Sequence, residues 1–505
     1  MTRILTPLLT LVMALALGAA LAQERGGTLT AAWAQDPVGL DPHVTSAYSS
    51  FQVLENVMDT LVELDDEQNV VPSLATDWSV SDDGTVWTFE LREDVRYSNG
   101  RAFTAEDVKY TYERMLDPDT GSGNAYKIQP LQEIEVVDDH TVRLILESPN
   151  AAFLGHLAID KSVGMIARES VEDGTINTEP IGTGPFVIAE YQPGSMVRLE
   201  RNEHYWRTDE DGTQLPYLDA IELQIITDES VRRSGLVAGD LHWAISVPTQ
   251  ALPELEERDD VVVDRTSAPA YWYVGVNTEV EPLNDVRVRQ AISYALDRGQ
   301  ITEAATFGTG VPTQDPIPSA SAWAFDYTPY DQDLERAREL LSEAGVADGF
   351  EMTVMPTTQY EESIRIAQVL QAHLAPLGIQ VSIDTREWAD WLETQGAGEY
   401  DTYVCSWNAL IDPDDFYYAQ HKTGEVFNFT GYSNPTVDEL LDEGRRTEGF
   451  EARYEIYEEI NQEIVDDAPY IYLYNPGNIQ AYAPAVQGFE ARSDQAIRFR
   501  TTWLD

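Results

Sequence analysis

The chain has 505 residues, of which 43% are hydrophobic, so it is long enough for two or more lobes and can bury a large core. Asp and Glu number 88 against 32 Lys and Arg, a formal net charge of −56, which we interpret as an aid to solubility that also repels nucleic acid and anionic lipid headgroups. The single cysteine, Cys405, excludes an intramolecular disulfide and a thiolate metal cluster.

The first 22 residues are typical of a secretory signal peptide. Arg3 precedes an apolar run from Leu8 to Leu17, and Ala20 and Ala22 are the small residues of a cleavage site. The apolar run is shorter than the roughly 20 residues that span a bilayer, and no cysteine for a lipid anchor lies near the cleavage site. We therefore expect a periplasmic protein without an anchor, beginning at Gln23.

The stretch from Trp78 to Val108 has the most regular pattern in the chain. Apolar residues alternate with polar ones from Trp87 to Leu91, which predicts a strand with one buried face. Thr104 stands three residues before Asp107, a spacing at which the two side chains cap the start of a helix. The stretch predicts a strand, a turn and a capped helix, and none of its residues indicates chemistry.

Two later motifs are also interpreted as scaffold. The sequence GTGPF from Gly182 to Phe186 lacks the Lys of a phosphate-binding loop, and Pro185 removes a backbone donor from it. Apolar residues at helical spacing between Val286 and Arg298 predict an amphipathic helix.

A β-α-β crossover is predicted in the second half of the chain. Phe350–Val354 and Ile379–Ile383 have strand patterns, and Ile366–Leu377 between them has the pattern of a helix, which implies a parallel sheet. Ligands of such sheets bind beyond the carboxyl ends of the strands. The candidate loops are therefore Pro356–Glu361 and Trp407–Phe416.

The stretches Trp78–Val108, Gly182–Phe186 and Val286–Arg298 resemble the extracellular solute-binding proteins of family 5, which feed peptide and nickel ABC importers. The resemblance implies an α/β, two-lobed periplasmic-binding-protein fold of type II, large cluster, with a hinge of two crossings and an extra subdomain in lobe I. The implied boundaries are 23 to about 268 plus about 478–505 for lobe I, 269–477 for lobe II, and about 53–180 for the subdomain.

The same resemblance implies the substrate-binding component of an ABC importer. Such a protein captures a peptide-like solute in the interlobe cleft by hinge closure and delivers it to an inner-membrane permease complex. We favour an oligopeptide as the solute. We expect a monomer with no cofactor, no metal site, no nucleic-acid partner and no enzymatic activity.

The terminal anchors of a short peptide differ from the family pattern. In peptide-binding relatives a loop that resembles Trp-x-x-Asp-x-x-Asp-Pro uses its first Asp for the peptide's ammonium group, and here Leu410 takes that position. Dipeptide-specific relatives carry an Arg for the carboxylate after a Met-Pro that here is Met355-Pro356, and this chain offers Gln359 and Tyr360. These departures favour a longer peptide held by its backbone, or a neutral ligand such as a sugar.

Three ligand contacts are predicted in the second candidate loop. Trp407 offers an aromatic platform, Asn408 an amide and Asp412 a carboxylate, and Pro413 stiffens the loop. The alternatives are that Trp407 is an ordinary core residue and that Asp412 forms a turn or caps a helix.

Further contacts are predicted near the crossing between the lobes and in a turn. Trp272 and Tyr273 belong to a dense aromatic strand at the crossing, so alternate members either face the cleft or pack in the core. Asn428 is a candidate contact in a turn that resembles one of the family.

Other functions have weaker support from the sequence. The seven His residues include no pair three to five apart, G-x-S-x-G is absent, and Cys405 lies in an apolar strand. Within the same scaffold, the alternative ligands are an oligosaccharide, an opine or a nickel chelate. A secreted hydrolase is the remote alternative.

Overall fold

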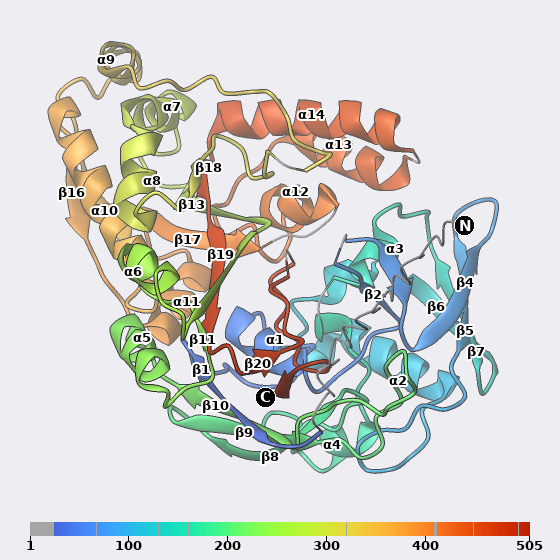
Figure 1. Cartoon of the computed structure of the whole chain (residues 1–505). Helices are drawn as coiled ribbons and strands as arrows, with labels where there is room; N and C mark the ends of the chain where they lie inside the picture. Colours follow the sequence, from blue (N-terminus) through green and yellow to red (C-terminus); the bar gives the residue numbers. More distant parts are fainter. Residues whose placement is uncertain are drawn as a thin grey trace, which may run out of the picture.

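The computed structural model describes residues 25–505 except for 67, 130, 160, 320, 409–411, 448 and 493. Two large sheets with helices packed against them form two lobes (Figure 1). The predicted signal peptide and Leu410 fall outside the described residues. None of the described helices combines the length and the apolar composition needed to cross a membrane.

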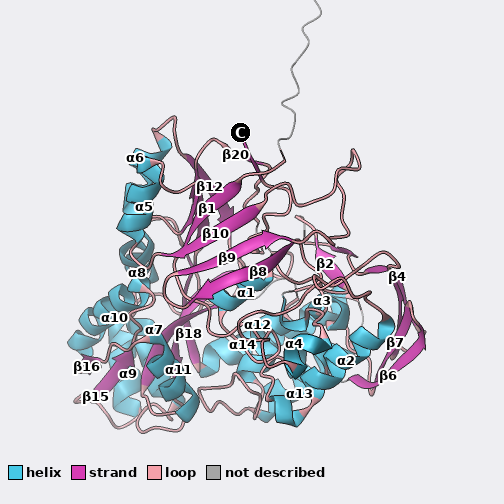
Figure 2. Ribbon diagram, turned by 90° about the horizontal axis from the view of Figure 1, so that it is seen from below, coloured by secondary structure: helices cyan, strands magenta, loops and turns pink. Residues whose placement is uncertain are grey.

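Lobe I is built on a seven-stranded sheet in the order β12-β19-β11-β1-β10-β9-β8 (Figure 2). The central strand β1 pairs in parallel with β10 and β11, and the remaining pairs are antiparallel. Helix α1 packs on one face, and α5 and α6 pack against β11 and β12. The bounds are β1 Thr28–Trp33, α1 Tyr48–Leu54, β8 Phe186–Gln192, β9 Met196–Arg201, β10 Ala220–Ile225, α5 Glu229–Ala238, β11 Trp243–Ile245, α6 Leu252–Glu256, β12 Val262–Ser267 and β19 Gly477–Tyr482.

The extra subdomain of lobe I is an antiparallel sheet in the order β4-β5-β7-β6 with α2 against it. The predicted strand and helix are confirmed, because β5 buries Phe89 and Leu91, and the Asp107 carboxylate accepts a hydrogen bond of 2.9 Å from the Thr104 backbone N–H. The bounds are β2 Val62–Leu64, β3 Val70–Pro72, β4 Ala75–Val80, β5 Val86–Leu91, α2 Ala105–Leu116, β6 Leu131–Asp138, β7 Thr141–Leu146, α3 Phe153–His156 and α4 Arg168–Glu172.

Lobe II is built on a six-stranded sheet in the order β14-β18-β13-β17-β15-β16. The predicted crossover is confirmed, since α10 connects the parallel neighbours β15 and β16. The bounds are β13 Ala270–Val276, α7 Val286–Ala295, α8 Arg298–Thr306, β14 Val311–Pro312, α9 Leu334–Glu343, β15 Glu351–Met355, α10 Glu361–Leu374, β16 Gln380–Ile383, α11 Trp388–Ala397, β17 Thr402–Asn408, α12 Asp414–His421, α13 Pro435–Arg446, α14 Phe450–Asp467 and β18 Tyr470–Asn475.

The two faces of the lobe II sheet bury different cores. Aliphatic residues from α7 to α10 fill one side, and a cluster rich in tyrosine lies on the other side beneath α12 and α14. Cys405 belongs to the tyrosine-rich core, where burial raises the pKa of its thiol to about 12. Cys405 is thus buried in the apolar strand in which the sequence places it.

The chain passes between the two sheets twice. It leaves β12 at Ser267 and enters β13 at Ala270, and it leaves β18 at Asn475 and enters β19 at Gly477. The predicted boundary between residues 268 and 269 lies in the first crossing, and the one between 477 and 478 lies at the start of β19. The Asn475 side chain ties them together, because its Nδ2 donates to the Ala270 carbonyl at 2.9 Å.

The GTGPF motif allows close backbone packing in lobe I. The Gly184 N–H donates to the Val57 carbonyl at 3.0 Å. A Cβ atom at Gly184 would lie 2.4 Å from the carbonyl carbon of Val57 and 2.6 Å from the backbone nitrogen of Met58. Since backbone cannot yield as a flexible side chain does, glycine is required at this contact.

We expect Gly184→Ala to lower the free energy of unfolding by about 1–3 kcal/mol, because the added methyl group overlaps the backbone of residues 57 and 58. Urea unfolding followed by circular dichroism measures the effect. The matched control is Gly396→Ala, in α11, where nothing lies within 4 Å of the added Cβ and a gain in stability is expected. Equal unfolding midpoints for the two variants would contradict the packing argument.

Candidate binding site between the lobes

One edge of the lobe II sheet carries both predicted loops. β15 and β17 are parallel, so their carboxyl ends meet at the same edge. β13 begins there as well, because Ala270 pairs with Asn408. Both chain crossings leave from this edge, which places Pro356–Glu361 and the described residues of the loop Trp407–Phe416 where the two lobes meet.

Tyr360 connects the lobes on one side of this edge. Its hydroxyl donates a long hydrogen bond of 3.5 Å to Oε1 of Gln35, which follows β1 of lobe I. Its ring contacts the rings of Trp272 and Trp388 edge-on, with centroids 5.8 and 5.5 Å apart. Burial raises the pKa of the Tyr360 phenol well above its usual value, so the hydroxyl remains a donor at neutral pH. Two of the predicted residues, Tyr360 and Trp272, are thus in contact.

A second polar contact between the lobes involves Asn408. Its Oδ1 accepts a hydrogen bond of 3.2 Å from Nε2 of Gln495, in the C-terminal segment that Figure 1 shows between the lobes. The Gln495 carbonyl in turn accepts a hydrogen bond of 2.7 Å from the Tyr48 hydroxyl of α1. Gln495 has a φ of 59°, a left-handed conformation that is costly for a residue with a side chain. The strained residue is therefore the one through which lobe I contacts Asn408 of the loop Trp407–Phe416.

Trp407 and Gln359 lie at the same sheet edge and are half-buried. The Trp407 ring packs edge-on against Phe427 at 5.1 Å, and its Nε1 donates to the Asp415 carbonyl at 3.3 Å. The Gln359 backbone N–H donates to Oγ1 of Thr357 at 3.2 Å. Loop hydrogen bonds therefore fix both positions.

Asp412 has a structural role in the observed geometry. Its two carboxylate oxygens each lie 2.7 Å from a guanidinium nitrogen of Arg453, and Oδ1 also accepts the Asp414 backbone N–H at 3.0 Å. This arrangement corresponds to the alternative of a turn and cap before α12. With its oxygens so occupied, Asp412 is a support for the loop.

Tyr273 and Asn428 also have structural surroundings. Tyr273 is 2% exposed and its ring stacks on Tyr470 with centroids 4.0 Å apart, on the sheet face opposite to Trp272. The Asn428 amide donates to the carbonyls of Lys422 and Tyr432 at 3.0 and 2.7 Å. The first packs a core and the second holds a turn, so we do not retain them as ligand contacts.

A buried contact between a histidine and two carboxylates also joins the lobes. Nε2 of His156, at the end of α3, lies 3.0 Å from Oδ1 of Asp415 and 3.4 Å from Oδ2 of Asp414, at the start of α12. Beside it, the Ala151 N–H donates to the Arg445 carbonyl at 2.8 Å. The subdomain of lobe I is thus in direct contact with lobe II.

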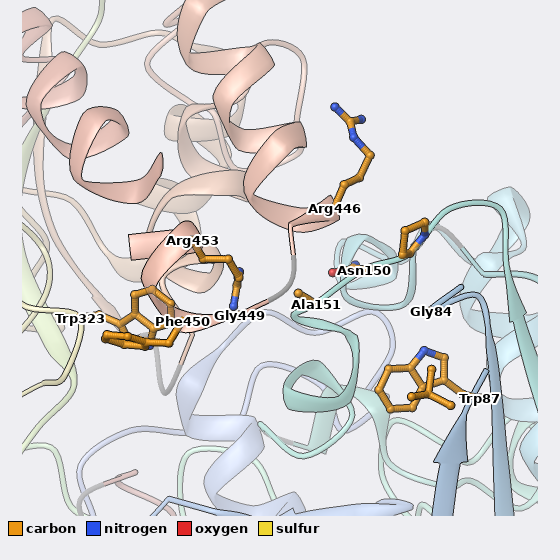
Figure 3. A pocket seen from close by; sticks show the side chains of 11 residues that line it. Gly84, Trp87, Asn150, Ala151, Trp323, Arg446, Gly449, Phe450 and Arg453 are labelled. Atoms are coloured by element: carbon orange, nitrogen blue, oxygen red, sulfur yellow. The ribbon is translucent and has the colours of Figure 1, made fainter. Parts of the chain in front are cut away.

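A pocket of about 430 Å³ opens next to this contact, between the subdomain and lobe II (Figure 3). Trp87 lies on one side of it, and Trp323 and Phe450 lie on the other. Its lining consists of Val80, Gly84, Trp87, Pro149, Asn150, Ala151, Trp323, Arg446, Gly449, Phe450 and Arg453. None of the predicted contacts lines this pocket, although Asp412 pairs with Arg453 on its wall.

Comparison with known families identifies the scaffold. The family described as bacterial extracellular solute-binding proteins, family 5 Middle, matches residues 69–428, more than half of the chain. The chain belongs to this family. The two sheets and the two crossings described above are therefore those of a family 5 solute-binding protein.

Three relatives illustrate the similarity of this family 5 protein to known ones. It is 30% identical to di/tripeptide-binding protein 1 of Pseudomonas aeruginosa, over 90% of each chain. The structure of DppA from Helicobacter pylori in complex with the peptide STSA matches 95% of the chain and 98% of its own, with a TM-score of 0.88 and 26% identity. The structure of AgaA from A. tumefaciens R10 with agropinic acid matches 95% and 99%, with a TM-score of 0.87 and 27% identity.

Four residues at the interface were not predicted from the sequence: Gln35, Tyr48, His156 and Gln495. Only Gln35 has a local sequence feature that could have indicated its role, because it follows a strand. The others depend on partners far away in the sequence, as with His156 and Asp415. The position of Leu410, where a peptide-anchoring Asp was sought, falls outside the described residues.

We expect Asp412→Asn to lower the free energy of unfolding by roughly 3 kcal/mol, because it leaves the buried Arg453 guanidinium without its carboxylate. Thermal and urea unfolding measure the effect. Asp390→Asn is the matched control, since Asp390 is 60% exposed and its pair with Arg386 contributes at most about 1 kcal/mol. If Asp412→Asn is as stable as this control, Asp412 is not the support described here.

Proposed function

We propose that this family 5 protein is the substrate-binding component of an ABC importer and captures a peptide-like solute between its lobes. The observation that carries the proposal is the meeting of neutral donors and acceptors from both lobes, Tyr360 with Gln35 and Asn408 with Gln495, at one sheet edge. The peptide groups of a bound solute offer the same kinds of donor and acceptor. The backbone of that solute can therefore form hydrogen bonds with these side chains in place of those that the side chains make with each other. The names of the P. aeruginosa and H. pylori relatives support a peptide.

The site favours a peptide bound through its backbone over one bound through its termini. Asp412, the carboxylate closest in sequence to the expected ammonium anchor, is neutralised by Arg453. Gln359 and Tyr360 replace the expected anchor for a carboxylate. Aromatic rings of Trp272 and Trp407 provide apolar surface beside these polar groups.

Capture proceeds by motion about the two crossings. Each crossing is short, and together they let the lobes rotate around one edge of each sheet. Closure excludes water from the solute, which strengthens each hydrogen bond inside. The protein then presents the solute to an inner-membrane permease, acts as a periplasmic monomer, and leaves the solute chemically unchanged.

Isothermal titration tests the ligand class. We expect heat of binding with tri- to pentapeptides, and peptides with an acetylated amine and an amidated carboxylate should bind within about tenfold of the free ones, since that difference is 1.4 kcal/mol. Agropinic acid, cellobiose and Ni(II)-histidine are the comparison ligands. Binding of one of these with no binding of peptides would overturn the peptide class, and mass spectrometry of the recovered solute checks that it is intact.

We expect Tyr360→Phe to weaken peptide affinity about two- to tenfold, because one hydrogen bond contributes about 0.5–1.5 kcal/mol. Titration with the same peptide measures the effect. Tyr327→Phe is the matched control, since it removes a hydroxyl that donates to Asp466 at 2.7 Å within lobe II, away from the sheet edge. Unchanged affinity in Tyr360→Phe would show that the Tyr360 hydroxyl does not contribute to peptide binding.

A further inference from the structure

His156 joins the lobes inside the protein, out of contact with solvent. The side chains of His156 and Asp414 are 0% exposed, and that of Asp415 is 4% exposed. His156 belongs to the subdomain of lobe I, and both aspartates belong to α12 of lobe II. The contact therefore exists only while the lobes are together.

The atoms that face the two ring nitrogens of His156 favour its protonated form. Nδ1 lies 3.0 Å from the Lys127 carbonyl oxygen, which only accepts hydrogen bonds, so Nδ1 carries a proton. Nε2 faces the carboxylates of Asp414 and Asp415. While both carboxylates are ionised they would repel a lone pair on Nε2, so Nε2 then also carries a proton. His156 is an imidazolium in this arrangement.

The balance of charges around α12 requires the same state. Asp414 has a guanidinium partner in Arg445, with contacts of 2.8 and 2.7 Å, and Asp412 has one in Arg453. Among the described residues, Asp415 pairs with no Arg or Lys, and His156 is its cation. The aspartates Asp412, Asp414 and Asp415 thus have two guanidinium partners in lobe II, and lobe I supplies a third positive charge.

The other groups near His156 do not replace it. The Tyr457 hydroxyl donates to Asp414 at 3.2 Å, and the Tyr126 ring meets the imidazole edge-on at 6.3 Å. The Lys127 ammonium donates to Oγ of Ser162 at 2.9 Å, and Glu425 adds a further negative charge near Asp414 and Arg445. Burial lowers the pKa of His156, but the two aspartates outweigh it and raise the pKa to about 9.

We propose that His156 is a proton-dependent latch, which holds the lobes closed on the solute when its imidazole is protonated against Asp415. The proposal rests on the hinge closure proposed above. When the lobes separate, water solvates both groups and the pKa of His156 returns to its ordinary value near 6.5. Closure then takes up a proton at any pH between the two values.

The sign of the pH effect follows from this difference. The group has the higher pKa in the closed state, so its stabilisation of closure is complete below about pH 6.5 and is lost as the pH rises through about 9. Between these two pH values the equilibrium constant for closure falls by up to about tenfold per pH unit, because closure takes up one proton. The solute is held more tightly at acidic pH.

Small-angle X-ray scattering of the protein without solute tests the latch independently of ligand identity. We expect a smaller radius of gyration at pH 6 than at pH 9.5 in the wild type. Asp415→Asn should give a smaller difference between the two radii, because only Asp414, which also pairs with Arg445, then faces His156. Equal radii in the wild type, or an unaltered pH response in Asp415→Asn, would overturn the latch.

Titration with the tetrapeptide Ser-Thr-Ser-Ala provides the second readout. We expect its affinity to fall by up to about tenfold per pH unit between pH 7 and 9 in the wild type and to fall less steeply in Asp415→Asn. His204→Gln, which alters an exposed histidine of lobe I, should keep the wild-type slope. A wild-type slope in Asp415→Asn would reject the proposal. Absence of peptide binding would count against the proposed function alone, since the scattering result does not depend on it.

Discussion

Two short crossings, from Ser267 to Ala270 and from Asn475 to Gly477, constrain how the lobes meet. Because both leave from one edge of each sheet, the lobes face each other along those edges and along the extra subdomain. Each polar group there must find a partner in the opposite lobe, a water molecule or a solute. The pairs Tyr360–Gln35, Asn408–Gln495 and His156–Asp415 are the partners observed.

Several arginines of this acidic chain are buried in pairs with carboxylates. Arg445, Arg453 and Arg498 have side chains at most 8% exposed and pair with Asp414, Asp412 and Glu55 inside the protein. Each of these pairs buries one positive and one negative charge, so the surface keeps the whole negative net charge. The interior is balanced by close pairs, and the imidazolium of His156 completes that balance at the interface.

Local patterns predicted the scaffold well. The strand and capped helix of Trp78–Val108 and the crossover of β15, α10 and β16 depend on periodicity and capping, which neighbouring residues determine. The candidate site was predicted only in part, because sheet topology placed the loops but not the side chains. Asp412 was open to two interpretations until its partner Arg453 was known, and His156 gave no signal, since its partners follow it by half the chain.

The position of β19 has a consequence for the order in which the molecule can assemble. β19 (Gly477–Tyr482) lies between β11 and β12 in the lobe I sheet, although the other six strands precede it by more than two hundred residues. A growing chain can complete lobe II while lobe I still lacks an inner strand. The lobe I sheet is therefore complete only when the chain has returned from lobe II, and the segment that brings Gln495 to the interface follows immediately. The contacts between the lobes thus depend on a part of the chain that comes after both lobes have been traced.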